Sequence, residues 1–356
     1  MPIDRPQSAP LLSVRDLRVT FAVRRDGDLP WTKPHLLQAV GGVDFDLMPG
    51  QTLGIVGESG SGKSTLARAL IGLVSATGTA RWGDGTNLIG LSPRKMLKYR
   101  GDIQMIFQDP LASLNPRMTV GQIIAEPLTT HHPELGRAEV KSRVKDMMDR
   151  VGLLPNQINR YPHEFSGGQC QRIGIARALI VRPKLIICDE PVSALDVSIQ
   201  AQVINLLAEL QRDLGLALIF IAHDLSVVKH ISNRVLVMYL GRVMEIAEAE
   251  ALYDRPEHPY TQALLSAVPI PDPVRERAKL VVPLRGELPS PMAPPSGCVF
   301  RTRCPRAQEL CARERPALHG PDHHLTACHF PGPLTPEEIG LRPMVAAPAP
   351  ALTGSM

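Results

Sequence analysis

The sequence predicts an α/β fold with a mostly parallel sheet, and three features of the chain support this prediction. A glycine-rich loop at 57–65 follows a short apolar run and precedes a run of helix-forming composition. Two further strand-like runs, 185–190, which is apolar until it ends in two carboxylates, and 216–222, which is apolar throughout, are separated by the helical stretch 197–214. Continuous apolar strands that alternate with helices indicate a parallel sheet with both faces covered. The length of 356 residues corresponds to roughly two domains, or to one large domain with an appendix.

The individual elements follow in order from apolar periodicity and turn signals. Before residue 110 the apolar segments are mostly typical of strands, and after about residue 185 predicted strands and helices alternate. Between about 110 and 165 the strand signals vanish, which predicts a helical subdomain inserted between strands. The predicted strands are 11–22, 36–47, 51–56, 103–107, 185–190, 216–222, 235–240 and 243–247, the last two as a hairpin. The predicted helices are 65–74, 121–128, 137–151, 166–180 and 197–214.

The loop at 57–65 has the pattern G-x-x-x-x-G-K-S, and its place between a strand and a helix is what a phosphate-binding P-loop requires. Glycines let the backbone wrap around a phosphate chain, and the amides at the helix start face an anion. Lys63 is expected to reach the β- and γ-phosphates, and Ser64 to hold Mg²⁺. A plain glycine-rich turn is the alternative, but it would not need a lysine and a serine at this offset. The expected phosphate contacts are Gly57, Ser59, Gly60, Ser61, Gly62, Lys63, Ser64 and Thr65.

Polar side chains follow three other predicted strands. Asp189 ends an apolar run, where a carboxylate can hold Mg²⁺ beside the P-loop, and Glu190 directly after it could polarise the attacking water. Gln108 could contact Mg²⁺ or water, although most glutamines are simply solvated, and a lone histidine at the place of His223 is more often structural. Beside a P-loop, these positions predict a hydrolytic site with Glu190 and His223 as its catalytic residues. The expected Mg²⁺ ligands are Ser64, Gln108 and Asp189.

The sequence Ser-Gly-Gly-Gln at 166–169 predicts a second helix start that can bind an anion. The serine can cap the helix, and the bare glycine amides can face a phosphate. A helix cap alone would explain this pattern, but one nucleotide does not need two such helix starts. The simplest explanation is a dimer, in which this helix faces the γ-phosphate held by the partner's P-loop. The residues expected there are Ser166, Gly167, Gly168 and Gln169.

These motifs, in this order, resemble those of the ATP-binding subunits of ABC transporters. The stretch 165–169 is similar to the family's signature motif, with Phe165 where leucine is commoner. The Ser-Ala-Leu-Asp sequence at 193–196 resembles the D-loop, which implies a nucleotide contact for Asp196. Gln108 and His223 match the Q-loop and H-loop.

The resemblance covers about residues 11–250 and implies the architecture and ligands of that family. It implies a P-loop NTPase core, an antiparallel β subdomain and an inserted helical subdomain, with ATP and Mg²⁺ as ligands. Phe21 is placed like the aromatic residue that stacks on adenine, ahead of a longer loop through Trp31.

Further stretches resemble the oligopeptide/dipeptide permease group of this family, which includes some nickel importers. They are 106–117, 238–242 and 258–265, and 297–305 is similar to the group's C-terminal extension. The implied organisation is an ABC nucleotide-binding domain at 11–250 with its helical subdomain at about 110–165, a small Cys-rich C-terminal extension at 251–330, and a flexible tail at 331–356.

The resemblance implies an ATP-hydrolysing motor of an importer, most closely one for dipeptides or oligopeptides, while the same motor could serve nickel or another solute. The implied partners are a second, related ATP-binding subunit, two transmembrane permease subunits and an extracytoplasmic substrate-binding protein. The implied location is peripheral, at the cytoplasmic face of the inner or plasma membrane. A soluble ABC ATPase acting on DNA or ribosomes is a competing class, but such proteins usually carry two nucleotide domains in one chain. A regulatory module without turnover is a third class, and the Asp189–Glu190 pair argues against it.

Composition narrows the partners further. The net charge of +4 neither favours nor excludes nucleic acid. Aromatic residues make up 4% of the chain and no basic and aromatic stripe is present, which argues against a stacking platform for single strands, and no nucleic-acid partner is expected. No segment approaches the ~18 apolar residues of a membrane span, and the first ten residues lack a signal-peptide pattern.

Four of the six cysteines, Cys298, Cys304, Cys311 and Cys328, lie close together in the sequence, which in a cytosolic chain first indicates metal ligands. The permease resemblance implies a [4Fe–4S] cluster, for which four thiolates suit four irons. Zinc is the second choice, because its knuckles usually show closer cysteine pairs, and free or disulfide-bonded thiols are the third. The nearby histidines are expected on the surface, although they could compete as ligands: His319, His323, His324 and His329. Cys170 and Cys188 are expected to be inert buried thiols.

Overall fold

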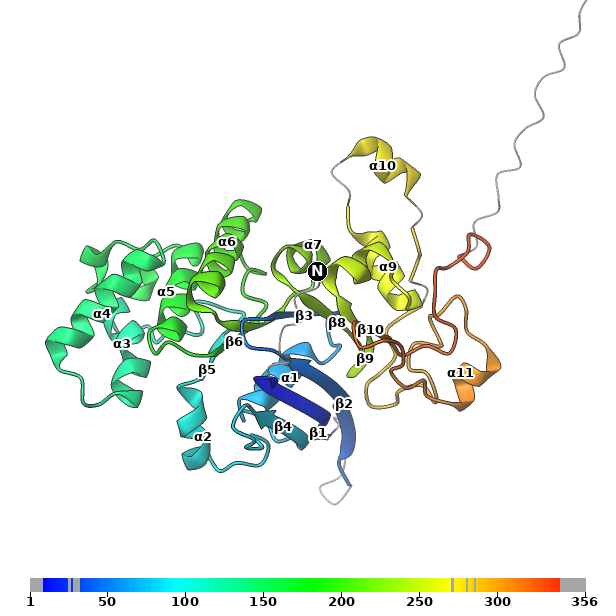
Figure 1. Ribbon diagram of the computed structural model, residues 1–356, viewed down its shortest axis with the longest axis horizontal. Helices are drawn as coiled ribbons and strands as arrows, with labels where there is room; N and C mark the ends of the chain where they lie inside the picture. The colour runs from blue at the N-terminus through cyan, green and yellow to red at the C-terminus, as the bar shows by residue number, and fades with distance from the viewer. Residues whose placement is uncertain are drawn as a thin grey trace, which may run out of the picture.

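The computed structural model describes residues 9–24, 27, 33–269, 272–279, 281–284 and 286–339. The predicted loop through Trp31, and the predicted tail beyond residue 339, lie outside these residues. In Figure 1 a helical subdomain occupies one end of the molecule and the C-terminal segment occupies the other, with the β-sheets between them. None of the described helices is long and apolar enough to cross a membrane.

The central sheet has seven strands, and its parallel part confirms the α/β prediction. The order across it is β10 (His324–Thr326), β9 (Arg242–Glu248), β8 (Arg234–Tyr239), β3 (Thr52–Val56), β7 (Ala217–Ile221), β6 (Leu185–Asp189) and β5 (Ile103–Ile106). Strands β8, β3, β7, β6 and β5 are parallel, whereas β9 pairs antiparallel with both β8 and β10. Every residue of β3, β6 and β7 is buried, which is why these strands are continuous apolar runs in the sequence.

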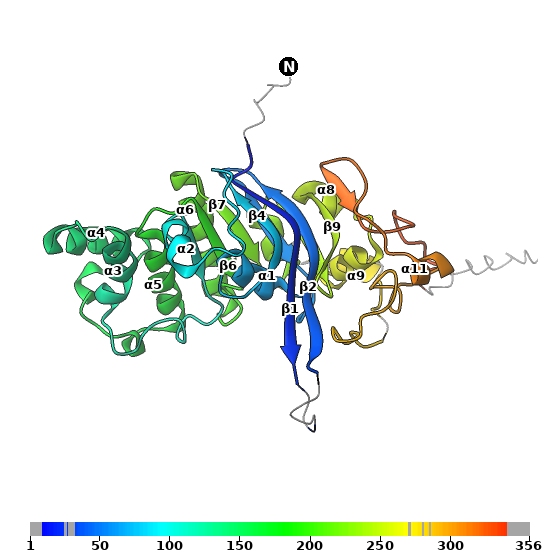
Figure 2. The ribbon, with the colours of Figure 1, turned by 90° about the horizontal axis from the view of Figure 1, so that it is seen from below.

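A second, antiparallel sheet lies against the helix that follows the P-loop. Its order is β2 (His35–Leu47), β1 (Leu12–Val23) and β4 (Thr77–Trp82), and its apolar face shares a core with helix α1 (Lys63–Leu70). Figure 2 shows β1 and β2 running across the middle of the molecule. Neither β4 nor helix α2 (Pro93–Arg100) is predicted from the sequence, because β4 buries only two of its six residues and α2 only two of its eight.

The helices lie close to their predicted places. They are α3 (Val120–His131), α4 (Arg137–Arg150), α5 (Gly167–Leu179) and α6 (Val197–Leu214), with short 3₁₀ turns at Pro155–Gln157 and Pro162–Glu164. Helix α7 (Leu225–Ile231) is not among the predicted helices. The hydroxyl of Thr119 caps α3, and the side chain of Gln122 bonds back to the Thr119 amide. Helix α1 ends at Leu70 rather than at the predicted residue 74, because Gly72 adopts a φ of +70° and turns the chain.

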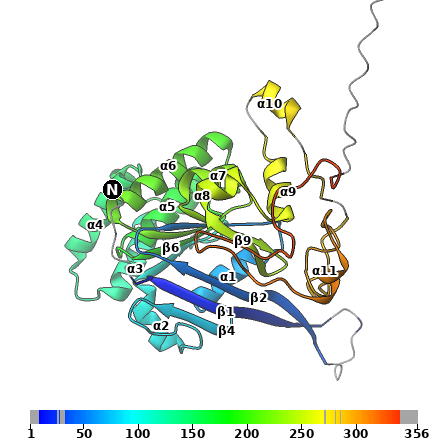
Figure 3. The ribbon, with the colours of Figure 1, turned by 45° about the vertical axis from the view of Figure 1, so that its right-hand side comes forward.

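The C-terminal segment packs on the central sheet and extends it. Helices α8 (Ala249–Asp254), α9 (Pro259–Ala267), α10 (Pro273–Ala278) and α11 (Glu309–Arg313) precede β10, and Figure 3 shows α9 and α11 on the side of the molecule where β9 lies. Buried Glu245 of β9 holds this segment: it accepts hydrogen bonds from the amides of Glu257 (2.8 Å) and His258 (3.1 Å) and contacts Nε2 of His324 at 2.6 Å. The prediction of a surface position is therefore wrong for His324, which is 7% exposed; its hydrogen bond to Glu245 raises its pKa.

Candidate nucleotide site

The P-loop takes its shape from glycines that no other residue could replace. Gly57 and Gly62 have φ angles of +150° and +99°. A Cβ on Gly57 would lie 2.1 Å from the carbonyl oxygen of Met238, and one on Gly62 would lie 2.2 Å from that of Ala39. The loop is therefore pressed against strands β8 and β2, and Gly62 caps α1, whose first amides face the loop.

Lys63 lies folded over the P-loop. Its Nζ donates to the carbonyl oxygens of Gly57 (2.7 Å) and Glu58 (3.1 Å), and the residue is only 4% exposed. Burial lowers the pKa of Lys63, while the nearby carboxylates of Glu190, Asp189 and Glu58 oppose this shift. The ammonium group thus sits at the centre of the loop, where a phosphate chain could replace the two carbonyl oxygens as its partner.

Ser64 and Asp189 meet at the predicted magnesium position. The hydroxyl of Ser64 donates to Oδ1 of Asp189 at 2.6 Å, and Asp189 is fully buried at the end of β6. Its other oxygen, Oδ2, has no hydrogen-bond partner among the described residues, and the nearest cation is Arg68 at 3.9 Å. A buried carboxylate oxygen without a partner, next to a serine hydroxyl, fits the oxygen ligands that Mg²⁺ requires.

Glu190 lies where β6 turns away, in a strained backbone conformation with φ of +47°. Its Oε2 accepts a hydrogen bond from Nε2 of Gln108 at 3.0 Å, so the structure brings these two predicted residues together. Exposed His223 lies beside Glu190: both line a small cavity of about 70 Å³, and no hydrogen bond to His223 occurs in the described part of the chain. The carboxylate therefore stands between the P-loop on one side and the histidine on the other.

A larger cavity of about 400 Å³ lies over the P-loop. Gln108 and Glu190 line it at one side, and Phe21, 38% exposed, lines it from β1. Most of the predicted phosphate contacts also line it: Ser59, Gly60, Gly62, Lys63, Ser64 and Thr65. An apolar ring face, a ring of backbone amides and a carboxylate around one cavity are the features that a nucleoside triphosphate needs.

The second helix start lies away from this cavity and is exposed. Ser166 caps α5, accepting from the amide of Gln169 at 3.4 Å, while its own amide donates to the Gln169 side chain at 3.0 Å. A Cβ on Gly168 would lie 2.5 Å from Ile199, so this glycine lets α5 approach α6, whose N-terminus is capped by Asp196. None of these residues lines the cavity over the chain's own P-loop.

Comparison with known proteins agrees with this geometry. Residues 40–193 match the ABC transporter family, and residues 244–311 match the oligopeptide/dipeptide transporter C-terminal region. The oligopeptide transport ATP-binding protein OppF of Escherichia coli is 64% identical over 325 residues, which are 91% of this chain and 97% of that protein. The chain belongs to the oligopeptide/dipeptide group of ABC transporter ATP-binding proteins. It is therefore an ABC-type ATPase, as the resemblance of its motifs predicts.

Other relatives of this ABC ATPase support the same assignment. OppF of Haemophilus influenzae is 62% identical over 89% of this chain and 96% of that protein. The cbiO1 protein of Clostridium perfringens, part of the ABC transporter complex cbiONQ, is 27% identical with a TM-score of 0.58 over 69% of this chain and 91% of that chain. The dimeric ATP-binding cassette MJ0796, in a post-hydrolysis state bound to ADP and Pi, is 25% identical with a TM-score of 0.59 over 67% of this chain and 98% of that chain.

The C-terminal segment of this ABC ATPase contacts the P-loop directly, which no sequence motif predicts. Nη1 of Arg303 donates to both oxygens of Glu58, at 3.0 and 2.8 Å, and the Arg303 side chain is only 8% exposed. The hydroxyl of Tyr260 accepts from the Glu58 amide at 2.9 Å. Pro291 lines the cavity over the P-loop. The partners are separated by 245 residues for the ion pair and 202 for the tyrosine bond, so local sequence carries no signal for them.

We expect replacement of Arg303 by methionine to weaken ATP binding. The change leaves the Glu58 carboxylate half-buried without its partner, so the P-loop should be less well ordered for phosphate. An increase in the KM for ATP of about three- to tenfold, with a smaller change in kcat, is expected in a phosphate-release assay. Arg313→Met is the matched control, because Arg313 forms an exposed ion pair with Glu309 that contributes little. An unchanged KM would show that the ion pair does not support the P-loop.

The four C-terminal cysteines gather as free thiols. Burial raises the pKa of Cys304 to about 12, and this thiol interacts electrostatically with Cys328, Cys298 and Cys311. The amide of Cys298 donates to the carbonyl of Cys311 at 2.8 Å, and Sγ of Cys328 accepts from the amide of Phe330 at 3.4 Å. Within the described residues, however, no group of three or more His, Cys, Asp or Glu side chains is arranged to hold a metal ion. The positions of the thiols therefore do not support the predicted [4Fe–4S] or zinc site.

Cys170 and Cys188 lie inside the ATPase core. Both are fully buried free thiols, one in α5 and the other in β6. Burial raises the pKa of each, which disfavours the thiolate form that reacts or binds metal.

Proposed function

We propose that this chain is the ATP-hydrolysing motor subunit of an importer for dipeptides or oligopeptides. The observation that carries the proposal is the match of the chain, over nearly the whole length of OppF, to relatives that are named as oligopeptide transport ATP-binding proteins. The match to the C-terminal region of oligopeptide/dipeptide transporters supports it independently of the ATPase core. In this proposal 11–250 is the nucleotide-binding domain, with the helical subdomain at about 110–165, and 251–330 is the extension.

Each residue around the P-loop has a distinct part in the proposed chemistry. Lys63 and the P-loop amides bind the β- and γ-phosphates, and the ring of Phe21 packs against the adenine. Ser64, Gln108 and Asp189 hold Mg²⁺, which would neutralise charge on the phosphates.

The hydrolytic step belongs to the carboxylate at the end of β6. Glu190 accepts the proton of the attacking water, and His223 positions that carboxylate or the γ-phosphate. The hydrogen bond from Gln108 at 3.0 Å orients Glu190 and links it to the start of the helical subdomain. Loss of the γ-phosphate would change this contact, and the change would pass to the helices.

Two subunits complete the proposed site. The exposed helix start at Ser166, Gly167, Gly168 and Gln169 lies outside the chain's own cavity, so it is free to face the γ-phosphate in a partner. Asp196, at the exposed N-terminus of α6, lies on the same surface and would contact the partner beside it. The partner in this proposal is a second, related ATP-binding subunit.

The remaining assembly follows from the importer assignment. Two transmembrane permease subunits would receive the motion of the helical subdomain near Gln108, and an extracytoplasmic substrate-binding protein would deliver the peptide. The chain would lie on the cytoplasmic face of the inner or plasma membrane, attached through the permease subunits.

Peptide uptake into proteoliposomes tests this function. The chain is reconstituted with its second ATPase, the two permease subunits and the substrate-binding protein, and entry of labelled dipeptides, longer peptides and nickel is measured with and without ATP. The proposal predicts ATP-dependent peptide entry that stops when Glu190 is replaced by glutamine. Uptake of nickel alone, or ATP hydrolysis that no peptide stimulates, would contradict it.

We also propose, separately from the ATPase function, that Cys298, Cys304, Cys311 and Cys328 become ligands of a [4Fe–4S] cluster when iron is supplied. The support for this proposal is chemical, because four neighbouring thiols are the donor set that such a cluster uses. Because the thiols are not arranged to hold a metal as they stand, the loops that carry them would have to shift. Iron and sulfide analysis of anaerobically purified protein, with its visible absorption, tests this. Protein free of iron would overturn it, and zinc in its place would favour the second choice.

A further inference from the structure

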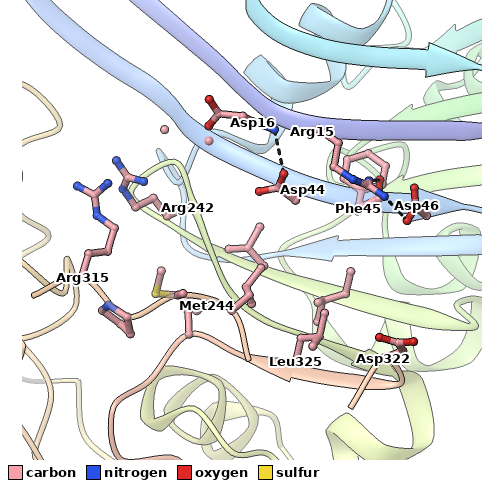
Figure 4. A pocket seen from close by; sticks show the side chains of 18 of the residues that line it. Arg15, Asp16, Asp44, Phe45, Asp46, Arg242, Met244, Arg315, Asp322 and Leu325 are labelled. Carbon is pink, nitrogen blue, oxygen red and sulfur yellow. Dashed lines mark hydrogen bonds and ion pairs between the residues drawn. The ribbon is translucent and has the colours of Figure 1, made fainter. Parts of the chain in front are cut away.

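A second cavity, of about 1000 Å³, lies between the β1–β2 sheet and the C-terminal strands of the central sheet (Figure 4). One wall is formed by strands β1 and β2, and the opposite wall by β9, β10 and the segment that precedes β10. Its apolar surface includes Met244, Ile246 and Leu325. Nothing in the proposed ATPase chemistry uses this cavity.

Two arginines, Arg242 and Arg315, extend their guanidinium groups into the same end of the cavity (Figure 4). Neither forms an ion pair with a carboxylate anywhere in the described chain, and the only polar contact of Arg242 is a long hydrogen bond to Gln38 at 3.4 Å. The two arginines that β1 contributes to the lining are paired, because Arg15 contacts Asp46 at 2.7 Å and Arg18 contacts Asp16 at 2.7 Å. A third arginine of the lining, Arg234, also forms no ion pair within the described residues, and its Nη2 donates to the carbonyl oxygen of Asp322 at 3.2 Å. Arg242 and Arg315 are therefore the two unpaired arginines that lie together at one end.

The surroundings of Arg242 disfavour the positive charge of its guanidinium group. Burial, together with the positive charges of Arg315 and Arg18, lowers the pKa of Arg242 to about 10, and Asp16 offsets only part of this shift. The guanidinium fits because residue 41 is a glycine: a Cβ there would lie 3.0 Å from Cζ of Arg242. A ligand with negative charge could accept charge-assisted hydrogen bonds from both guanidinium groups, exposed Arg315 and half-buried Arg242.

We propose that this cavity binds a small amphipathic oxyanion, with its carboxylate or phosphate held between Arg242 and Arg315. The apolar body of the ligand would lie along Met244 and Leu325. Two carboxylates in the lining form no ion pair with the described residues: Asp44, which accepts from the amide of Asp16 at 2.9 Å, and Asp322. Figure 4 places Asp322 at the end of the cavity away from the two arginines, so the polarity of the cavity orients the anion toward Arg242 and Arg315.

The oxyanion cavity and the nucleotide cavity are separate but share a boundary. Gln38 and Ala39 of β2 and the turn residues Leu240 and Gly241 line the nucleotide cavity. The residues that follow in each segment, from Gly41 and from Arg242, line the oxyanion cavity. Because the P-loop itself binds phosphate, a binding test needs the nucleotide cavity filled.

Isothermal titration of the full chain, saturated with Mg²⁺ and ADP, provides this test. The probe is hexyl phosphate, with inorganic phosphate and hexanol as the compounds that lack its tail or its charge. We expect hexyl phosphate to bind more tightly than either, and Arg242→Gln and Arg315→Gln each to weaken it by on the order of tenfold or more. Arg137→Gln, at the exposed start of α4, is the matched control and should leave binding unchanged.

The results distinguish binding at the two arginines from binding elsewhere on the chain. If hexyl phosphate does not bind to the wild-type chain, or binds equally well to both arginine variants, the proposal is overturned. The affinity of each variant for ADP shows whether that variant is folded. If Arg242→Gln loses ADP binding, the affinity of Arg315→Gln for hexyl phosphate is the result that tests the proposal. Hexanoate in place of hexyl phosphate then shows which oxyanion the arginines prefer.

Discussion

Replacement of Glu190 by glutamine is expected to slow ATP hydrolysis by roughly 10²- to 10⁴-fold while ATP binding is preserved. Glu190 is a carboxylate that lines the cavity over the P-loop, and it follows β6 in a strained backbone conformation with φ of +47°. Glutamine has nearly the same shape and can still accept the hydrogen bond from Gln108, but it cannot take a proton from water. Only the base is removed, so kcat should fall without a matching rise in the dissociation constant of ATP.

Phosphate release and binding of a fluorescent ATP analogue measure these two quantities on the same protein. Glu209→Gln, on the exposed face of α6, makes the same chemical change away from the site and should behave as wild type. A Glu190→Gln protein with wild-type turnover would mean that another group acts as the base.

Replacement of Lys63 by methionine is expected to have the opposite pattern, with loss of ATP binding itself. The ammonium of Lys63 is the cation at the centre of the P-loop, and it is 4% exposed. Charge-assisted hydrogen bonds to two phosphates in a water-poor cavity are strong, so we expect ATP affinity to fall by about 100-fold or more. Methionine keeps most of the apolar length of the side chain, which limits repacking.

The same substitution leaves the carbonyl oxygens of Gly57 and Glu58 without their donor, so thermal unfolding must be measured alongside binding. Lys95→Met, on the exposed face of α2, is the matched control. If Lys63→Met binds ATP as tightly as wild type and remains folded, the lysine is only a structural support of the loop.

The local parts of the site could be predicted from sequence because each is a short pattern with its own physical reason. Gly57 and Gly62 are needed where a Cβ would strike a carbonyl, and Asp189 follows a run of wholly buried residues. The hydrogen bonds between Ser64 and Asp189 and between Gln108 and Glu190 then follow from the parallel strand ends meeting at one edge of the sheet.

The long-range parts could not be predicted in this way. Arg303 and Tyr260 reach Glu58 only because β9 and β10 bring the C-terminal segment back to the P-loop. His324 is buried by its contact with Glu245, although the chain around it is polar. The cysteines show the opposite limit: their spacing predicts a metal site, yet no group of side chains arranged to hold a metal ion is found among the described residues.

Sedimentation of the Glu190→Gln protein with Mg²⁺ and ATP tests most directly whether this chain holds half of a composite ATP site. Because hydrolysis is blocked, we expect ATP to drive the protein, alone or mixed with its related second subunit, into a dimer that binds two ATP molecules. Ser166→Arg, added to Glu190→Gln, should prevent the dimer while each monomer still binds ATP, since Ser166 lies outside the chain's own cavity. A monomer that stays a monomer when saturated with ATP, or a dimer that Ser166→Arg leaves intact, would contradict the composite site.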